Sequence, residues 1–328
     1  MGSGIWSTDV YAAAKVYRKA SGKTDFDYSD STTRSTPRSS WKTHKDLDPF
    51  GVALRESRDS DEHPNSVAIA VLLDVTGSMG RVPRVLQQKL PDLFGLLLKK
   101  GYVKDPQILF GAIGDATCDR APLQMGQFES DNRLDEQLGN ILLEGGGGGQ
   151  MSESYELAMY FMARHTSIDC MEKRGRKGYL FLIGDELAYP KVSRSQVKKL
   201  IGDTLGEDLD TAALVAELRR SYEVFYLLPE GASYSGNTEI LEFWRGLLGQ
   251  NVLILDDLDA VCETIAVTIG LNEGVLDDLD AGLKDLQELG LATTSVAKAL
   301  AKRSTATIVA VDHELGVVDH DLDASVLV

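Results

Sequence analysis

The sequence predicts an α/β protein with a doubly wound, mostly parallel sheet that helices cover on both faces. Residues 66–74 read Ser-Val-Ala-Ile-Ala-Val-Leu-Leu-Asp, an apolar run of strand length that is typical of a strand buried on both faces. A second apolar run of this kind spans residues 178–184. Around these runs, strand-like segments alternate with segments whose apolar residues recur at helical spacing. In such sheets, ligands bind beyond the carboxyl ends of the strands.

The individual elements follow from the same patterns, taken in chain order. Apolar runs predict strands at residues 66–74, 107–115, 178–184, 223–228 and 251–255, with an antiparallel edge strand at 123–128. Helical spacing predicts helices at 7–20, 83–102, 134–143, 154–164, 194–201, 211–222, 238–248 and 258–270. Residues 21–65 are rich in Ser, Thr, Asp, Arg and Lys, so they are expected to form a loop or an extended arm. Two short amphipathic helices are expected within residues 276–303, followed by a strand at 306–311.

Three regions are therefore expected: an N-terminal helix and irregular arm at 1–64, an α/β domain at 65–273 and an acidic, helical C-terminal extension at 274–328. The composition, with 43% hydrophobic and 26% charged residues, is that of a globular protein. Neither an apolar run of membrane-spanning length nor a secretory signal is readable, which predicts a cytoplasmic protein. The net charge of −16 opposes nonspecific binding to nucleic acid or anionic membranes. The three cysteines show no metal-ligand spacing.

The strongest local signal is Asp74-Val75-Thr76-Gly77-Ser78, which follows the most apolar strand and precedes a helix. Mg²⁺ prefers about six oxygen ligands in octahedral geometry. Thr76 and Ser78 could bind it directly, while Asp74 binds or orients a water. Few direct charges would leave the metal able to accept a carboxylate from a partner. The alternative is a turn in which the hydroxyls cap the free N–H groups of the next helix.

Two further segments reach the same edge of the predicted sheet. The strand at 178–184 is followed by Asp185, which supplies a carboxylate, and by Glu186, which is expected to be exposed. The glycine run 145–149 leads through residues 150–154 into the next helix. Asp115 ends a neighbouring strand, where it either contacts the glycine-rich loop or serves as a cap or a solvated loop residue.

Together these segments resemble the metal-ion-dependent adhesion site (MIDAS) of von Willebrand factor type A (VWA) domains, over residues 65–272. The resemblance implies a divalent cation, with Mg²⁺ favoured over Mn²⁺ or Ca²⁺. It assigns residues to three metal loops: Asp74, Thr76 and Ser78 to the first and Asp185 to the third. The second loop departs from the family, which usually has a Thr there. This chain offers Ser152, Glu153 and Ser154, and the sequence does not choose among them.

The resemblance further implies a binding protein rather than an enzyme, in which a partner protein supplies an Asp or Glu to the metal. Intracellular bacterial members of the family work beside AAA+ ATPases of the MoxR type, and this chain, which has no P-loop, is similar to such an adaptor. The alternative is a phosphotransferase resembling haloacid dehalogenases, with Asp74 as nucleophile and Asp185 as a Mg²⁺ ligand. Two features oppose it: no second Asp follows Asp185 in that loop, and the glycine run has no role there.

Overall fold

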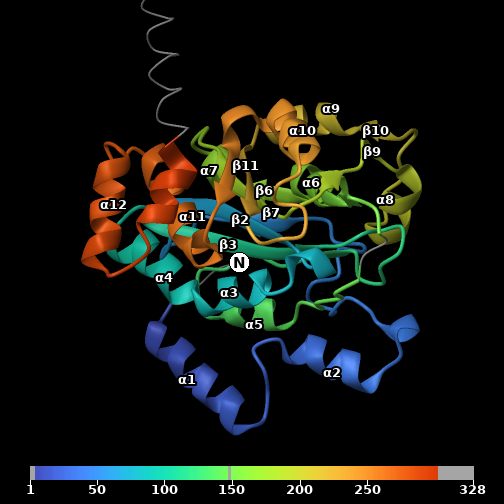
Figure 1. The fold of residues 1–328 in the computed structure, drawn as a ribbon, viewed down its shortest axis with the longest axis horizontal. Coiled ribbons are helices and arrows are strands. Elements are labelled where there is room, and N and C mark those ends of the chain that lie inside the picture. The colour runs from blue at the N-terminus through green and yellow to red at the C-terminus, as the bar shows by residue number, and fades with distance from the viewer. Residues whose placement is uncertain (1–3, 147–148, 302–328) are drawn as a thin grey trace, which may run out of the picture.

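A six-stranded sheet lies at the centre of the protein, whose computed structural model describes residues 4–146 and 149–301 (Figure 1). The strand order is β12-β11-β7-β2-β3-β4, and every neighbouring pair is parallel except β3 and β4. The strands are β2 (Ser66–Asp74), β3 (Asp105–Ile113), β4 (Leu123–Met125), β7 (Gly178–Ile183), β11 (Tyr222–Pro229) and β12 (Val252–Leu255). The mixed α/β class, the mostly parallel sheet and the antiparallel edge strand are as predicted.

The order of the strands brings two carboxyl ends together in the middle of the sheet. From β2 the chain adds β3 and β4 on one side, and it then returns to add β7, β11 and β12 on the other. β2 and β7 are therefore neighbours, paired from Ile69 with Tyr179 to Leu73 with Ile183. A crevice outside such strand ends is where open α/β sheets bind ligands.

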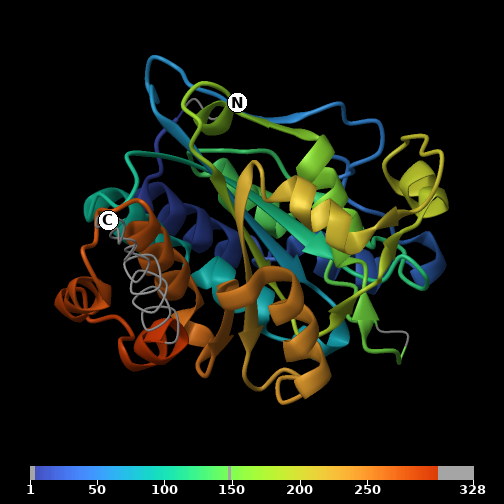
Figure 2. The same ribbon diagram turned by 90° about the horizontal axis from the view of Figure 1, so that it is seen from above.

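Helices lie on both sides of the sheet (Figures 1 and 2). They are α1 (Thr8–Ala20), α2 (Asp27–Ser35), α3 (Val82–Gln88), α4 (Leu90–Phe94), α5 (Arg133–Gly139), α6 (Tyr155–Arg164), α7 (Asp169–Glu172), α8 (Arg194–Leu200), α9 (Thr211–Leu218), α10 (Thr238–Leu248), α11 (Val261–Asn272) and α12 (Leu279–Glu288). All nine residues of β2 are buried. Ile69 and Val71 join the core that contains α4 and α11, whereas Ala70 and Leu72 join the core that contains α6 and α10. Burial on both faces explains why this strand is apolar at successive positions.

The predicted helix 83–102 is wrong as a continuous element. The segment forms α3, α4 and a π-helical turn at Gly95–Lys99. Pro91 explains the first break, since proline has no backbone N–H and its ring clashes with the carbonyl four residues earlier in a helix. It is accommodated here in the first turn of α4.

The N-terminal arm, residues 4–64 of the described chain, is more ordered than its composition predicted. α1 is as expected, but the supposed loop also contains α2, a 3₁₀ turn at Arg38–Ser40 and β1 (Arg55–Ser57). Trp6 stacks on Phe94 with ring centroids 4.4 Å apart, and Tyr11 donates to Gln87 O at 3.0 Å. Phe26 and Leu47 are fully buried in the same core. The arm is therefore packed against the sheet domain.

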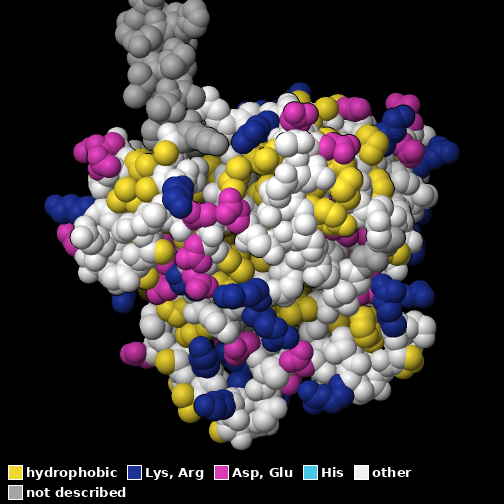
Figure 3. All heavy atoms as spheres, in the orientation of Figure 1, with side chains coloured by type: hydrophobic (Ala, Val, Ile, Leu, Met, Phe, Trp, Pro, Cys, Tyr) yellow, Lys and Arg dark blue, Asp and Glu magenta, His cyan; other side chains and the backbone are white. Residues whose placement is uncertain are grey.

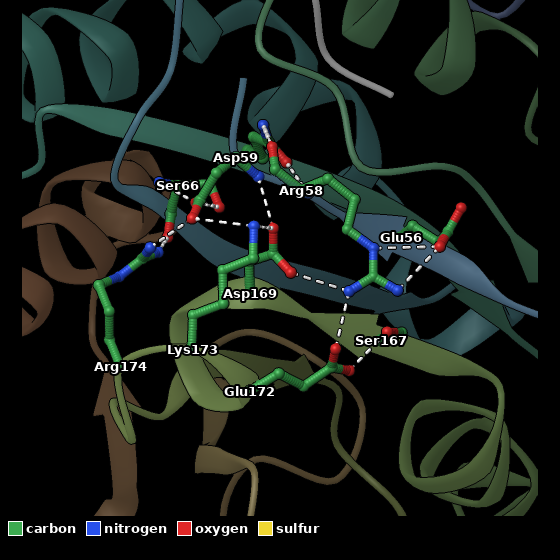
Figure 4. A network of polar contacts seen from close by, with 10 residues as sticks. Glu56, Arg58, Asp59, Ser66, Ser167, Asp169, Glu172, Lys173 and Arg174 are labelled. Carbon is green, nitrogen blue, oxygen red and sulfur yellow. Dashed lines mark hydrogen bonds and ion pairs between the residues drawn. The ribbon is translucent and has the colours of Figure 1, made fainter. Parts of the chain in front are cut away.

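A polar network fixes the segment that leads into β2 (Figure 4). Arg58 donates to Asp169 and Glu172 of α7, at 2.8 Å in both cases. Arg174 donates to Asp59 at 2.6 Å, and its charge, together with hydrogen bonds from Ser66, lowers the pKa of Asp59 to about 2 against the effect of burial. The network attaches the start of the central strand to the chain that precedes β7.

Four short pairings, which the sequence did not predict, complete the fold. Parallel pairs form between β1 and β6 (Thr166–Ile168) and between β5 (Ser152–Glu153) and β8 (Leu187–Ala188), and β9 (Lys191–Val192) pairs antiparallel with β10 (Leu209–Asp210). A single bridge joins Ile108 and Glu129. In the C-terminal extension α12 and a helical stretch at 294–301 match the two expected helices, and the expected strand at 306–311 lies outside the described residues.

The face of the described protein in Figure 3 is mixed in charge and also carries scattered hydrophobic side chains. On the face in Figure 3, acidic and basic side chains alternate, with a group of Lys and Arg side chains over α1 to α3. No helix within residues 4–146 and 149–301 is long and apolar enough to span a membrane.

Candidate metal centre

The first loop begins at Asp74, the last residue of β2, which is fully buried. Its Oδ1 accepts hydrogen bonds from the backbone N of Thr76 at 2.8 Å and from Thr76 Oγ1 at 2.5 Å. A 3₁₀ turn at Gly77–Met79 then places Ser78 Oγ 3.1 Å from Thr76 Oγ1. The two hydroxyls and the carboxylate therefore form one compact set of oxygens at the end of the strand.

The third loop supplies a second carboxylate to this set. Asp185 follows β7 and is fully buried. Its Oδ1 accepts from Ser78 Oγ at 2.7 Å, and its Oδ2 accepts from the backbone N of Tyr234 at 3.0 Å. Four of the predicted ligands, Asp74, Thr76, Ser78 and Asp185, are thus connected by direct hydrogen bonds.

The three candidates of the second loop differ in their surroundings. Ser154 is buried, and its Oγ accepts from the backbone N of Ala116 at 2.9 Å, so its hydroxyl is engaged with the loop after β3. Ser152 is half-buried in β5. Glu153 is 1% exposed, and its Oε2 has no hydrogen-bond partner. Burial and the negative charge of Asp74 raise the pKa of Glu153 to about 10. Of the three, Glu153 is the one whose charge interacts with Asp74.

Gly145 and Gly146, the first two residues of the glycine run, contact the first loop through their backbone. Gly77 donates its N–H to Gly146 O at 2.8 Å, and Gly145 donates to Val75 O at 3.3 Å. A Cβ at position 77 would lie 3.1 Å from Gly145 O, closer than ordinary van der Waals contact. Glycine at position 77 therefore permits the close approach of the two loops.

Glu186 was expected to be exposed, and that expectation is wrong, because it is only 4% exposed. Its backbone carbonyl accepts from Tyr226 Oη at 3.1 Å and from Trp244 Nε1 at 2.8 Å, two donors buried in the core. Burial and the charges of Asp74 and Asp185 raise the pKa of its carboxyl group to about 8. Nothing in the sequence indicated this burial, because a charged residue that follows an apolar strand is usually exposed.

Tyr155, at the start of α6, is a site residue that sequence reasoning missed. Its hydroxyl donates to Asp74 Oδ2 at 2.8 Å. The ring lies directly against the backbone of Gly184, where a Cβ would be 1.8 Å from the hydroxyl oxygen. Its position after the glycine run was the available signal, because a helix that starts there points its first side chains at the strand ends.

Asp115 is fully buried beyond the end of β3 and contacts the residue that follows the glycine run. It accepts from Thr117 Oγ1 at 2.6 Å, from Tyr189 Oη at 3.2 Å and from the side chain of Gln150. Both alternatives for Asp115 are seen, since it contacts Gln150 and also accepts from the backbone N of Thr117 at 2.9 Å as a cap of its own loop. It belongs to the surroundings of the candidate site.

The site concentrates buried carboxyl groups. Four acidic residues of the site are at most 4% exposed: Asp74, Glu153, Asp185 and Glu186. None of them forms an ion pair with a Lys or Arg of the described chain. Burial and the charge of Asp185 raise the pKa of Asp74 to about 7. Glu153 and Glu186 each keep one carboxyl oxygen without a partner. These unpaired oxygens fit a divalent cation, which would compensate charges that are costly to bury alone.

A divalent cation at this site would need the hydroxyl oxygens of Thr76 and Ser78 as ligands. Within residues 4–146 and 149–301, no group of three or more His, Cys, Asp or Glu side chains is placed to hold a metal ion. A cation here would depend on the hydroxyls of Thr76 and Ser78 in addition to carboxylates, as the oxygen chemistry of Mg²⁺ allows.

No protein-family model matches the chain, and no curated protein matches it either. Among solved structures, it is similar to the pilus adhesin SpaC from Lactobacillus rhamnosus GG in its open conformation, with 11% identity and a TM-score of 0.46 over 66% of this chain and 31% of the adhesin chain. It is also similar to proximal thread matrix protein 1 from the mussel byssus, with 9% identity and a TM-score of 0.38 over 64% of this chain and 46% of that one. This chain spans less than half of the length of the adhesin and of the matrix protein, and at these identities and TM-scores neither likeness bears on function.

Proposed function

We propose that the chain is a metal-dependent protein-binding module with a doubly wound, VWA-type fold, whose MIDAS-type site binds Mg²⁺ or another divalent cation. The observation that carries the proposal is the hydrogen-bonded set of Asp74, Thr76, Ser78 and Asp185 at the adjacent ends of β2 and β7. The four residues come from two loops 107 positions apart. Their convergence at a strand-end crevice is what ligand binding in this kind of sheet requires.

Each residue has a role that follows from its surroundings. Thr76 and Ser78 would offer neutral hydroxyl oxygens, and Asp74 and Asp185 would bind directly or orient waters. Ser152, Glu153 and Ser154 remain the candidates of the second loop: Glu153 has a buried Oε2 without a hydrogen-bond partner, whereas the Ser154 hydroxyl accepts a hydrogen bond from Ala116 N. When bound, the cation would supply an electrophilic position that an Asp or Glu of a partner protein completes.

For the partner, we propose a cytoplasmic protein such as an AAA+ ATPase of the MoxR type, with this chain as its adaptor. The family resemblance of the sequence motif supports this choice. The net charge of −16 disfavours nucleic acid and anionic membranes as partners.

Calorimetric titration with Mg²⁺ tests the proposal. Wild type should bind, whereas Asp74→Ala and Thr76→Ala should bind at least about tenfold more weakly, the loss that removing a supporting group from a metal site commonly causes. Thr117→Ala is a matched control, since Thr117 donates to Asp115 much as Thr76 does to Asp74. It should leave the affinity for Mg²⁺ unchanged.

Absence of Mg²⁺ binding by the wild type would refute the proposed function. A phosphatase assay on the same samples addresses the alternative. Turnover that disappears in Asp74→Ala would favour a phosphotransferase with Asp74 as its nucleophile.

A further inference from the structure

The N-terminal arm contacts the two residues that precede the glycine run. Ser29, in α2, is 2% exposed, and its Oγ accepts a hydrogen bond from the backbone N of Leu143 at 3.0 Å. Arg38, in the 3₁₀ turn that follows α2, donates from Nε to Oε1 of Glu144 at 3.2 Å. The two contacts join residues 114 and 106 positions apart, so they bring a distant part of the chain to the start of the glycine run.

Arg38 binds two buried carboxylates at once. Its Nη2 lies 3.0 Å from Oδ1 of Asp119 and 3.0 Å from Oε1 of Glu144, and both acidic side chains are at most 3% exposed. Backbone donors fix each carboxylate further, since Asp119 accepts from Asp115 N at 2.9 Å and Glu144 accepts from Arg120 N at 2.8 Å. Two carboxylates buried side by side are costly without a cation, so the Arg38 guanidinium offsets their charge.

Gly145 and Gly146 connect this ion pair to the first loop of the candidate site. The backbone of Gly146 lies directly against the guanidinium, since a Cβ there would be 2.9 Å from Nη2 of Arg38. The same two glycines bond to the first loop, because Gly77 donates its N–H to Gly146 O at 2.8 Å and Gly145 donates to Val75 O at 3.3 Å. A continuous set of contacts therefore runs from the arm through the two glycines to the first loop.

We propose that Arg38 is a positioning residue of the candidate site: by pairing with Asp119 and Glu144, it holds the two glycines against the first loop. The consequence for the site rests on the proposed function, and it is that the N-terminal arm supports Mg²⁺ binding although it lies outside the three metal loops. Without the guanidinium, two buried carboxylates of like charge would stand next to the glycines. The hydrogen bonds between the glycines and the first loop would then open more often.

Amide hydrogen exchange, followed by NMR in the presence of a chelator, measures this positioning without any metal. In Arg38→Met, the N–H groups of Gly77 and Gly145 should exchange at least about tenfold faster than in the wild type, because the hydrogen bonds that protect them open more often. The amide of Val71, in the fully buried strand β2, reports on the fold as a whole and should change far less. Arg38→Lys keeps the charge but not the fork of donors, so its rates should be intermediate.

Asp30→Asn is the matched control. Asp30 pairs with Arg84 at 3.3 Å, so this variant removes another ion pair between the arm and the sheet domain, one away from the glycine run. It should leave the exchange of both glycine amides unchanged. Calorimetric titration with Mg²⁺ on the same proteins completes the test. Arg38→Met should bind Mg²⁺ about tenfold more weakly than the wild type, and Asp30→Asn should match the wild type.

The outcomes separate the two proposals. If Gly77 and Gly145 exchange at the wild-type rate in Arg38→Met, or if Val71 speeds up as much as they do, the positioning role is overturned. Faster exchange of the two glycines with an unchanged affinity for Mg²⁺ also overturns it, because the arm then does not serve the site. If the wild type itself does not bind Mg²⁺, the proposed function fails, and the exchange rates alone still decide whether Arg38 holds the two glycines.

Discussion

Replacing Gly184 by alanine should disturb the site through Tyr155. The new Cβ would lie 1.8 Å from the Tyr155 hydroxyl oxygen and 2.7 Å from its Cζ. The ring has little room to retreat, because Tyr155 is fully buried and packs edge-on against Tyr226 and Trp244, with centroids 5.9 and 5.3 Å away. Any shift of the ring also strains the 2.8 Å hydrogen bond from its hydroxyl to Asp74.

The expected magnitudes follow from these contacts. Overpacking of a dense core costs about 1–3 kcal/mol, and a hydrogen bond to a buried carboxyl group contributes about 1–2 kcal/mol. Gly184→Ala should therefore lower the free energy of unfolding by about 2–4 kcal/mol, and Tyr155→Phe alone by about 1–2 kcal/mol. The phenylalanine lacks the hydroxyl oxygen that is in closest contact with the new Cβ. The double variant should therefore lose about 1–2 kcal/mol less free energy of unfolding than the sum of the two single-variant losses.

Urea unfolding at pH 7.5 in the presence of a chelator measures all four members of this cycle. Gly95→Ala is the control, since a Cβ there meets no atom within 4 Å, and its stability should equal or slightly exceed that of the wild type. If Gly184→Ala is as stable as the wild type, or if the two substitutions are additive, the close contact between Tyr155 and the backbone at position 184 is refuted.

Two further predictions concern regions away from the site. Arg174 keeps the pKa of Asp59 near 2. Because that value lies below the usual one, the contribution of Asp59 to stability is complete above about pH 4 and lost as the pH falls towards 2, and Asp59→Asn should cost about 1 kcal/mol at pH 7 after solvent screening. Unfolding curves between pH 7 and 2 should show a flatter acid limb for this variant, and an unchanged limb would contradict the ion pair. Trp6→Ala should cost about 3 kcal/mol in thermal or urea unfolding, because Trp6 is 8% exposed and stacks on Phe94. Ile5→Ala, at a residue 69% exposed, should cost less than about 0.5 kcal/mol, and equal losses in the two variants would argue against packing of the arm.

The central strands could be predicted because their burial leaves a direct mark on the sequence. β2 and β7 are buried at every position, and this environment favours a nearly continuous apolar run. Asp74 and Asp185 could be placed at the same edge of the sheet, but their meeting depends on the pairing of β2 with β7, which the sequence pattern did not predict. The residues that link them, Thr76 and Ser78, were predictable from their chemistry as oxygen donors.

Other features could not be predicted because they depend on contacts remote in sequence. The pairing of β5 with β8 involves two residues from each strand, too few to show any periodicity. Phe26 and Leu47 are isolated apolar residues in polar surroundings, yet both are fully buried. The burial of Glu186 depends on Tyr226 and Trp244, which lie 40 and 58 residues further along the chain.

The packed N-terminal arm has a consequence for the order in which the chain acquires its structure during synthesis. Tyr11 bonds to Gln87 and Arg18 to Asp135, which follow them by 76 and 117 residues. The arm therefore leaves the ribosome well before the surfaces that bury it exist, and local interactions alone must support it until then. Its many Ser, Thr and charged residues made its helices hard to predict from the sequence. The same residues keep the segment solvated until it packs against the rest of the protein.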